Sequence, residues 1–167
     1  YGTYLNSSDN NIISRCIAKN NTNGIYLQSS SNNKIIDNSN ISNNGLSGIV
    51  VRFSSENNIV SNSIVENNYN GVYISDLSDN NCICNNSFKN NQVQAWDNRS
   101  NRWDNGYPSG GNYWSDYGGW DKYLGENQDI PGSDGIGDTP YDIPGGTNQD
   151  RYPLVTKGLE LSISPSY

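Results

Sequence analysis

The stretch that decides the fold runs from Asn57 to Ser75 and reads NNIVSNSIVENNYNGVYIS. Paired asparagines separate short runs of β-branched residues, and within these runs apolar and polar residues alternate. Alternation at a spacing of two residues is typical of half-buried strands, whereas the i, i+3, i+4 spacing of a helix is not sustained. The stretch therefore predicts short strands joined by tight polar turns.

The same pattern recurs along the first half of the chain. Paired asparagines begin at residues 10, 32, 57 and 80, which gives repeats of 22, 25 and 23 residues. Repeats of this length are typical of solenoids, and strand-forming repeats of about 22 residues fit a parallel β-helix. We therefore predict an all-β solenoid of about four coils over residues 1–95, stacked at about 4.8 Å per coil.

Asparagines at equivalent places in successive coils are predicted to form ladders. A side-chain amide can donate a hydrogen bond to one neighbouring coil and accept one from the other, which satisfies backbone that strands leave unpaired. Asparagine and glycine also tolerate the left-handed conformation of sharp corners, and we expect Gly24, Gly48 and Gly71 to adopt it. The predicted ladder residues form two columns, Asn11, Asn33, Asn58 and Asn81 in the first and Asn20, Asn43, Asn67 and Asn90 in the second.

The character of the sequence changes at Trp96. Residues 1–107 contain no proline, as paired interior strands require, and all six prolines follow. The four tryptophans fall between Trp96 and Trp120. We therefore predict an irregular cap over residues 96–167, whose aromatic side chains either seal the last coil or offer a platform for a sugar.

The first residues lie in the middle of a coil. Residues 2–5, GTYL, align with residues 24–27, GIYL, at an offset of 22 residues. A coil without a neighbour presents unpaired strand edges, which pair readily with another chain. The sequence therefore predicts that further coils or another subunit cover this edge, and that a homo-oligomer or polymer forms through it.

Charge and composition exclude several partners and chemistries. The net charge is −7, and residues 96–167 hold eleven acidic against five basic residues, so neither nucleic acid nor an anionic membrane is an expected partner. The chain has no histidine, which removes the commonest general acid–base group and transition-metal ligand. No apolar run approaches the ~18 residues of a membrane span.

Three motifs in the second half of the chain add a family resemblance. They are GGNYWSDY at residues 110–117, DGIGDTPY at residues 134–141 and DRYPL at residues 150–154. With the coil pattern NNxIxNxIxxN, they resemble the NosD-like right-handed parallel β-helix proteins, which are named for a periplasmic copper-maturation factor and are abundant among archaeal cell-surface proteins. The resemblance implies a right-handed parallel β-helix with an irregular cap, exported to the cell surface.

Copper is the metal that this resemblance implies. The sequence lacks the histidine and methionine that copper sites favour, so only Cys16, Cys82 and Cys84 could serve. Cys82 and Cys84 stand two residues apart on one strand face, where a disulfide would be strained, and Cys16 is roughly 14 Å away. We expect no intrachain disulfide and interpret the thiols as buried apolar groups, with an intermolecular disulfide or a soft-metal site as alternatives.

The acidic run from Glu126 to Asp138 is the best candidate for a ligand site. Carboxylates on a glycine-bent loop suit Ca²⁺, which takes about six to eight oxygen ligands in flexible geometry. The run does not match an EF-hand loop, and a solvated acidic loop is the alternative interpretation. The predicted Ca²⁺ ligands are Asp129, Asp134 and Asp138, with Asp116 and Asp121 from the preceding loop.

Two acidic residues in adjacent coils could be a catalytic pair. Glu56 and Asp79 both precede paired asparagines, so their carboxylates could lie about 5 Å apart, as in retaining glycosidases. Asp9 and Ser31 share that column, however, so an exposed polar turn is the simpler interpretation. We predict no catalytic residue and a protein that is not an enzyme, with carbohydrate cleavage as the alternative.

Five Asn-x-Ser/Thr sequons could carry N-linked glycans in an exported protein, where the asparagine does not lie in an internal ladder. They begin at Asn6, Asn20, Asn40, Asn85 and Asn98.

The sequence leaves three functions open. The first is a structural subunit of a cell-surface layer, sheath or filament, stiffened by asparagine ladders and stabilised by Ca²⁺ in its cap. The second is a carbohydrate-binding or carbohydrate-cleaving module, for which a long solenoid face and aromatic side chains are suited. The third is copper delivery, by analogy with the protein that gives the family its name.

Overall fold

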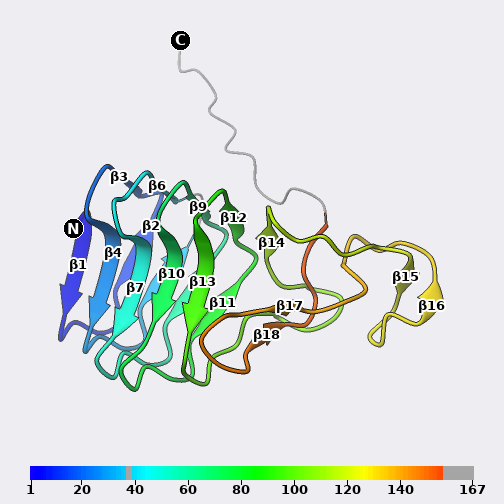
Figure 1. The fold of residues 1–167 in the computed structure, drawn as a ribbon. Helices are drawn as coiled ribbons and strands as arrows, with labels where there is room; N and C mark the ends of the chain where they lie inside the picture. Colours follow the sequence, from blue (N-terminus) through cyan, green and yellow to red (C-terminus); the bar gives the residue numbers. More distant parts are fainter. Residues whose placement is uncertain (37–38, 156–167) are drawn as a thin grey trace, which may run out of the picture.

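The computed structural model describes residues 1–36 and 39–155, and within them every regular element is a β-strand. The coils wind into a parallel solenoid, with the first coil at one end and the cap at the other (Figure 1). The predicted parallel β-helix is confirmed. Two of its sheets have five strands where about four coils are predicted. The described residues form no helix long and apolar enough to cross a membrane.

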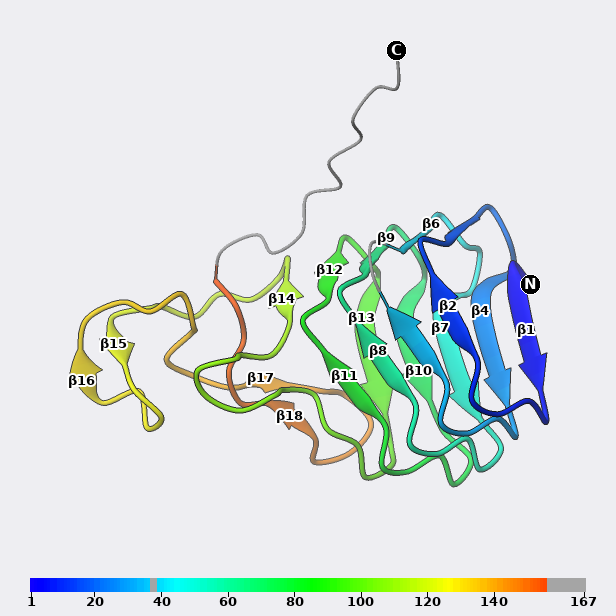
Figure 2. The ribbon, with the colours of Figure 1, turned by 180° about the vertical axis from the view of Figure 1, so that it is seen from behind.

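Successive coils contribute their strands to three parallel sheets, which form the sides of the solenoid (Figure 2). Sheet A consists of β1 (Thr3–Asn6), β4 (Asn23–Gln28), β7 (Ser47–Arg52), β10 (Asn70–Ile74) and β13 (Val93–Asp97). Sheet B consists of β2 (Ile12–Ser14), β5 (Lys34–Ile36), β8 (Ile59–Ser61) and β11 (Cys82–Cys84). Sheet C consists of β3 (Ile17–Lys19), β6 (Asn40–Ser42), β9 (Ile64–Glu66), β12 (Ser87–Lys89) and β14 (Tyr113–Trp114).

A thin apolar core fills the space between the sheets. In sheet A, Ile25, Ile49 and Val72 lie opposite one another in register. Each is completely buried, and sheets B and C add equivalent columns that include Ile35 and Ile41. Since side chains alternate along a strand, the neighbouring residues point to the outside of the solenoid. Each sheet therefore supplies the core with only one or two columns of inward-pointing side chains.

The first asparagine column forms a hydrogen-bonded ladder. Asn58 donates from Nδ2 to Oδ1 of Asn81 at 3.0 Å, and Asn81 donates in turn to Oδ1 of Asn101 at 3.0 Å. The backbone N–H groups of Asn33 and Asn58 also donate to the amide oxygen of the next coil at 2.9 Å. The structure brings Asn11, Asn33, Asn58 and Asn81 together in this column, where the amides satisfy backbone at a corner that has no strand partner.

The second ladder lies one residue later than the sequence predicts. Its members are Asn21, Asn44, Asn68 and Asn91. The predicted residues are exposed and have φ angles between 52° and 59°; they are Asn20, Asn43, Asn67 and Asn90. In each pair the first asparagine makes the left-handed turn, because its short polar side chain tolerates the left-handed conformation better than most. The second asparagine forms the ladder.

Glycine is required in the coils for a different reason from the one predicted. Gly24, Gly48 and Gly71 are absent from the residues with positive φ, so the prediction of left-handed glycines is wrong. A Cβ atom at Gly48 would lie 2.7 Å from the carbonyl oxygen of Gly71 and 2.7 Å from a methyl group of Val65. These positions need glycine because the backbone of the next coil approaches closely.

The parallel pairing continues beyond residue 95. β13 ends at Asp97, Arg102 forms a parallel bridge with Cys82, and β14 pairs with β12. The rest of the described cap, up to residue 155, is irregular apart from two antiparallel strand pairs and two isolated bridges of Leu154. These pairs are β15 (Tyr123–Leu124) with β16 (Ile130–Pro131) and β17 (Tyr141–Asp142) with β18 (Gln149–Asp150).

Aromatic rings close the core at the cap end. Trp103 and Trp114 are each 1% exposed, and the Trp114 ring stacks on Phe88 at 4.5 Å and on Tyr141 at 4.2 Å. The Trp114 indole N–H donates to the buried carboxylate of Asp150 at 2.9 Å. Two of the four tryptophans therefore seal the last coil, as the cap interpretation expects.

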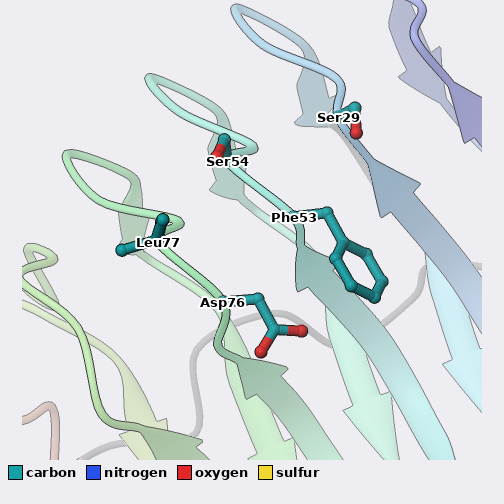
Figure 3. Close-up of a pocket in the computed structure, with 5 residues that line it drawn as sticks. All are labelled: Ser29, Phe53, Ser54, Asp76 and Leu77. Atoms are coloured by element: carbon teal, nitrogen blue, oxygen red, sulfur yellow. The ribbon is translucent and has the colours of Figure 1, made fainter.

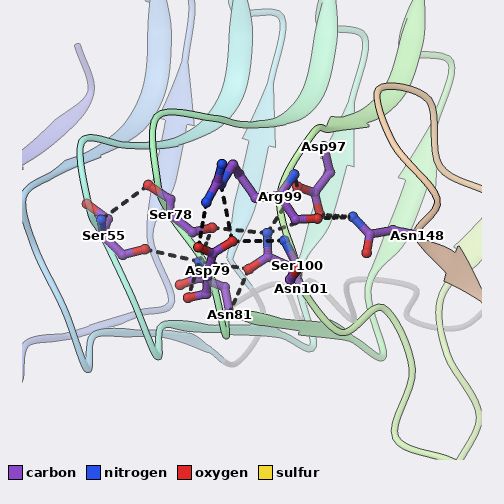
Figure 4. A network of polar contacts seen from close by, with 9 residues as sticks. All are labelled: Ser55, Ser78, Asp79, Asn81, Asp97, Arg99, Ser100, Asn101 and Asn148. Atoms are coloured by element: carbon purple, nitrogen blue, oxygen red, sulfur yellow. Dashed lines mark hydrogen bonds and ion pairs between the residues drawn. The ribbon is translucent and has the colours of Figure 1, made fainter.

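A polar network fastens the cap to the last coils (Figure 4). Asp97 is completely buried and accepts hydrogen bonds from Asn101 at 3.0 Å and from Asn148 at 2.9 Å. Arg99 donates to both carboxylate oxygens of Asp79, at 3.2 and 2.7 Å. Because Asn148 lies far along the chain from the coils, these contacts hold the returning cap against the solenoid.

Candidate functional site

The outer face of sheet A carries an aromatic column. Strand register aligns one outward side chain from each coil, next to the inward residues of the core. The aligned residues are Tyr4, Tyr26, Val50, Tyr73 and Trp96.

The rings of this column form two groups with Val50 between them. Tyr73 and Trp96 stack with their centroids 4.8 Å apart and their planes 9° apart, whereas Tyr4 meets Tyr26 edge-on at 5.6 Å. The stacking distance matches the spacing of adjacent strands, so this stack runs along the solenoid axis. The face of Tyr73 that Trp96 does not cover is therefore turned toward the coil of Val50.

A hollow of about 220 Å³ lies over Val50, between Tyr26 and Tyr73. These tyrosines stand two strands apart, or about 9.6 Å, which leaves room for one flat ring between them. The remaining lining mixes apolar groups with amide, hydroxyl and guanidinium groups, from Leu46, Tyr69, Asn23, Ser47, Asn70 and Arg52. Such a lining suits a small ligand with both an apolar face and several hydroxyl groups.

Arg52 stands at the rim of this hollow. Its Nε atom lies 2.6 Å from Oδ2 of Asp76, and its guanidinium carbon lies 4.8 Å from the Phe53 ring centroid and 6.0 Å from that of Tyr73. Burial raises the pKa of Tyr26, although the positive charge of Arg52 opposes the shift, so the phenol stays protonated. The Arg52–Asp76 pair is partly exposed and offers both donors and acceptors to a ligand.

A second and wider hollow, of about 590 Å³, lies on the Asp76 side of this pair. Figure 3 shows its lining on the corners of successive coils after sheet A, with the Phe53 ring and the Asp76 carboxylate projecting from neighbouring corners. Its lining residues all have positive φ angles and are Ser29, Phe53, Ser54, Asp76 and Leu77. We call the two hollows and the Arg52–Asp76 pair between them the sheet A site.

The sequence contained a signal for this site that the prediction did not use. The tripeptide Gly-x-Tyr occurs once in three of the repeats, ending at Tyr4, Tyr26 and Tyr73. Because the repeats stack in register, one aromatic residue at a fixed place in each repeat must produce a column on the surface. The hollow itself could not be predicted, because it depends on the smaller Val50 in the same column.

The predicted Ca²⁺ ligands lie in the cap, where loop donors already bind most of them. Asp121 accepts hydrogen bonds from Ser133 and Gly135, Asp138 accepts from Lys122 and Tyr123, and Asp134 accepts from Ile136. Asp116 accepts from the Tyr141 hydroxyl, and Asp129 is exposed. Among the described residues, no group of three or more His, Cys, Asp or Glu is arranged to hold a metal ion. Calcium therefore stays a prediction.

The predicted glycosylation sites differ in exposure. Asn6, Asn20 and Asn98 are exposed, and Asn85 is half-buried. Asn40 lies in β6 with only 8% of its surface exposed, so the folded protein does not present its amide to an enzyme.

One member of the acidic pair considered for catalysis, Asp79, is engaged in the structure. Asp79 binds Arg99 through both oxygens and also accepts the backbone N–H of Ser100 at 2.9 Å. The hydrogen bonds from Arg99 and Ser100 lower the pKa of Asp79. A carboxyl group with a lowered pKa does not suit the general acid of a glycosidase, so Asp79 is better explained as an anchor for the cap.

The three cysteines are free. Cys16 is half-buried, whereas the sulfur atoms of Cys82 and Cys84 lie 3.4 Å apart in a buried contact.

Comparison with known proteins gives one finding. The family model described as "Periplasmic copper-binding protein (NosD)" matches residues 1–119, which include all the coils and the beginning of the cap. No match is found among curated proteins or among solved structures.

The description of that family names copper, so we ask whether the residues of this chain could bind it. With no histidine or methionine in the sequence, thiolates are the soft ligands that remain. In the part of the chain that the structure describes, Cys82 and Cys84 are the thiols that meet. Since thiolates select the soft Cu(I) ion, the residues fit Cu(I) held by two sulfur atoms.

Proposed function

The chain belongs to the NosD family, whose description is periplasmic, and we propose that it acts outside the cytoplasm as a β-helix protein that binds a glycan at the sheet A site. The observation that carries the proposal is the hollow between Tyr26 and Tyr73, floored by Val50 and flanked by the Arg52–Asp76 pair.

The chemistry of the sheet A site favours a sugar over other ligands. A pyranose ring has apolar C–H faces that pack on aromatic rings and equatorial hydroxyl groups that bond to amides, guanidinium groups and carboxylates. The site supplies the Tyr73 ring face opposite Trp96, which the Arg52 guanidinium approaches at 6.0 Å from the centroid, and polar groups from Asn23, Asn70 and Arg52. A nucleic acid is disfavoured because the net charge is −7.

The two hollows suggest a chain of sugars rather than one residue. The smaller hollow has room for one ring, and the wider hollow beside Asp76 would hold the next. The Arg52–Asp76 pair, at 2.6 Å, lies where the linkage between the two sugars would pass. The favoured ligand is therefore a neutral oligosaccharide, because the pair already balances its own charge.

A glycan array followed by calorimetric titration tests the proposal. The protein should bind a set of related glycans, and Tyr73→Ala should weaken binding of the best one about tenfold through the loss of one stacked ring. Tyr123→Ala is the matched control, since Tyr123 is an exposed tyrosine in the cap, and it should bind as the unchanged protein does. The proposal fails if no glycan binds, or if the two variants lose the same affinity.

Stabilisation by Ca²⁺ is a second part of the proposal. It is supported by the proximity of two loops, because Asp121 accepts the backbone N–H of Asp134 at 3.2 Å and brings the two carboxyl-bearing residues together. A higher melting temperature in Ca²⁺ than in chelator, with heat on titration, is the expected result. Equal melting temperatures and no heat on titration would contradict stabilisation by Ca²⁺.

Assembly into a surface layer, sheath or filament, and N-linked glycosylation at the exposed sequons, also remain proposals. Solution scattering at rising concentration tests assembly, which would be contradicted by a monomer at every concentration with Ca²⁺ present. Intact-mass measurement on native protein tests glycosylation, which would be contradicted by an unmodified mass.

A further inference from the structure

The wider hollow of the sheet A site exposes two large apolar side chains. Phe53 is 43% exposed and Leu77 is 60% exposed, and both line this hollow. Figure 3 shows them on the corners of two neighbouring coils, together with Ser54 and Asp76. Apolar side chains scattered singly over a surface are ordinary, whereas two that line one hollow offer a ligand a place to bury apolar groups.

These two corners are longer than the corner before them. Ser30 and Ser55 occupy equivalent places in successive coils, because the Ser30 backbone N–H donates to the Ser55 hydroxyl at 3.0 Å. One residue separates β4 from Ser30, whereas two residues, of which Phe53 is the first, separate β7 from Ser55. The next corner carries Asp76 and Leu77 in the same two places. The extra residue gives each of these corners a second side chain that a ligand can contact.

The backbone of these corners is strained for the residues it carries. Phe53 and Leu77 have φ angles of 57° and 62°, in the left-handed region that bulky side chains rarely adopt. Most of the other non-glycine residues with positive φ in the described chain are asparagines, which tolerate that conformation and expose no apolar side chain. Neither folding nor solubility therefore explains Phe53 and Leu77, and strain of this kind is typical of sites that hold a ligand.

Polar groups with unused hydrogen-bonding capacity stand beside the two apolar side chains. Oδ2 of Asp76 accepts from Arg52 at 2.6 Å, whereas within the described residues no donor bonds to Oδ1. Ser29 and Ser54 line the same hollow and are exposed. The hollow therefore combines an apolar wall, a carboxylate acceptor and hydroxyl donors.

We propose that the sugar bound in the wider hollow is an N-acetylhexosamine, an inference that rests on the proposed binding of a glycan. The acetamido group of such a sugar carries a methyl group, an N–H donor and a carbonyl acceptor. The methyl group packs on Phe53 and Leu77, the N–H donates to Oδ1 of Asp76, and the carbonyl oxygen accepts from a serine hydroxyl. The ligand is neutral, which suits the balanced charge of the Arg52–Asp76 pair.

Other sugars satisfy this lining less well. A hexose has a hydroxyl group in place of the acetamido group and would leave Phe53 and Leu77 exposed to water. A 6-deoxy sugar supplies a methyl group but no neighbouring N–H for Asp76. A free amino sugar carries a positive charge, and the carboxylate that would balance this charge already pairs with Arg52 at 2.6 Å.

Matched pairs of disaccharides test the proposal by calorimetric titration. The probes are β-linked disaccharides of N-acetylglucosamine and of N-acetylgalactosamine, each with the glucose or galactose disaccharide of the same linkage. The better N-acetylated ligand should bind about tenfold more tightly than its counterpart, because it adds a buried methyl group and a hydrogen bond to a carboxylate. Equal affinities within each pair, or no binding of either N-acetylated disaccharide, would overturn the proposal.

Leu77→Asn separates ligand binding from folding. Asparagine tolerates the left-handed conformation, so this variant should melt at the same temperature as the unchanged protein or at a higher one. Its preference for the N-acetylated ligand should fall from about tenfold to about threefold, because the methyl group loses an apolar contact. Ile130→Asn is the matched control, since Ile130 is 54% exposed in the cap, and it should keep the preference. A Leu77→Asn variant that keeps the tenfold preference would contradict the proposal.

An NMR measurement on the unchanged protein locates the acetyl group without any variant. The chain has two phenylalanines, and Phe88 is completely buried. With isotope-labelled phenylalanine, an intermolecular NOE between the acetyl methyl protons and a phenylalanine ring therefore identifies Phe53, and this NOE is the expected result. Saturable binding without it would overturn the proposal.

Tyr73→Ala distinguishes this proposal from glycan binding as such. Tyr73 lines the smaller hollow, so its loss should weaken both members of a disaccharide pair equally. If a glycan on the array binds in a manner that depends on Tyr73 but no pair shows a preference, the sheet A site binds glycans and only the N-acetylhexosamine is wrong. If no glycan on the array binds, both proposals are wrong.

Discussion

Asparagine residues occur in pairs in this chain because the two members of a pair do different work. The first member turns the backbone through a left-handed conformation, as Asn67 does at φ 55°. The second member, Asn68, is 4% exposed and links its own coil to the next through Asn91. The same residue type serves both needs, since its side chain is short, polar and able to donate and accept at once.

Replacement of one ladder asparagine should therefore cost far more than replacement of its neighbour. Asn68→Ala removes the oxygen that accepts two hydrogen bonds from Asn44, and it should lower the free energy of unfolding by about 1–3 kcal/mol. Asn67→Gly keeps the left-handed turn and should change it by less than about 0.5 kcal/mol. Urea unfolding measures both changes, and equal decreases in the free energy of unfolding would contradict the different roles of the two asparagines.

Asp150 makes stability depend on pH. Burial raises its pKa to about 7, above the ~3.9 of an unfolded aspartate. The folded state then binds more protons, so the contribution of Asp150 is complete below about pH 4 and is lost as the pH rises through about 7. Between about pH 5 and pH 8, the unchanged protein should lose stability relative to Asp150→Asn in urea unfolding. No difference in slope from Asp150→Asn over that range would show that the buried carboxyl group is already ionised at pH 5.

At the scale of the strand and its corner, the close stacking of coils decides which residues are allowed. The second residue of β4, β7 and β10 is a glycine, Gly24, Gly48 or Gly71, that lies against the backbone of the next coil, so sheet A depends on it. Gly48 and Gly45 provide a comparison within one repeat, because neither has positive φ.

Gly48→Ala should therefore destabilise the protein, and Gly45→Ala should not. The added methyl group at Gly48 would meet Gly71 and Val65 at 2.7 Å, whereas at Gly45 its nearest neighbour would be 3.8 Å away. Overpacking of this kind costs about 1–3 kcal/mol. Thermal unfolding of the two variants is the measurement, and similar melting temperatures would mean that the coils separate more easily than their packing indicates.

The strands could be predicted from the sequence because each coil repeats the same alternation, and three more copies support any one assignment. The second ladder was misplaced by one residue because adjacent asparagines, such as Asn67 and Asn68, look identical in composition and differ only in φ and burial. The sheet A site could not be predicted because its hollow requires a small residue, Val50, within a column of aromatic rings. It also requires the Arg52–Asp76 pair at the rim, which comes from two neighbouring coils. Neither feature follows from periodicity.

At the scale of the whole molecule, the solenoid offers a ligand a flat, regularly spaced surface. Coils about 4.8 Å apart place side chains along the axis at intervals comparable with the size of a sugar ring. The ladders and the sealed cap keep these intervals fixed, so the sheet A site is formed before a ligand arrives. A preformed site loses little conformational entropy on binding, which helps a weakly interacting ligand such as a neutral oligosaccharide.

The most direct test of glycan binding at this site is to follow the four tryptophan indole N–H signals by NMR while titrating the best glycan from the array. Trp96 stacks on Tyr73 beside the smaller hollow, whereas Trp103 and Trp114 are buried and Trp120 is exposed in the cap. We predict a saturable shift of the Trp96 signal, with the other three signals unchanged. A shift confined to Trp120, or saturable binding that leaves Trp96 unmoved, would contradict it.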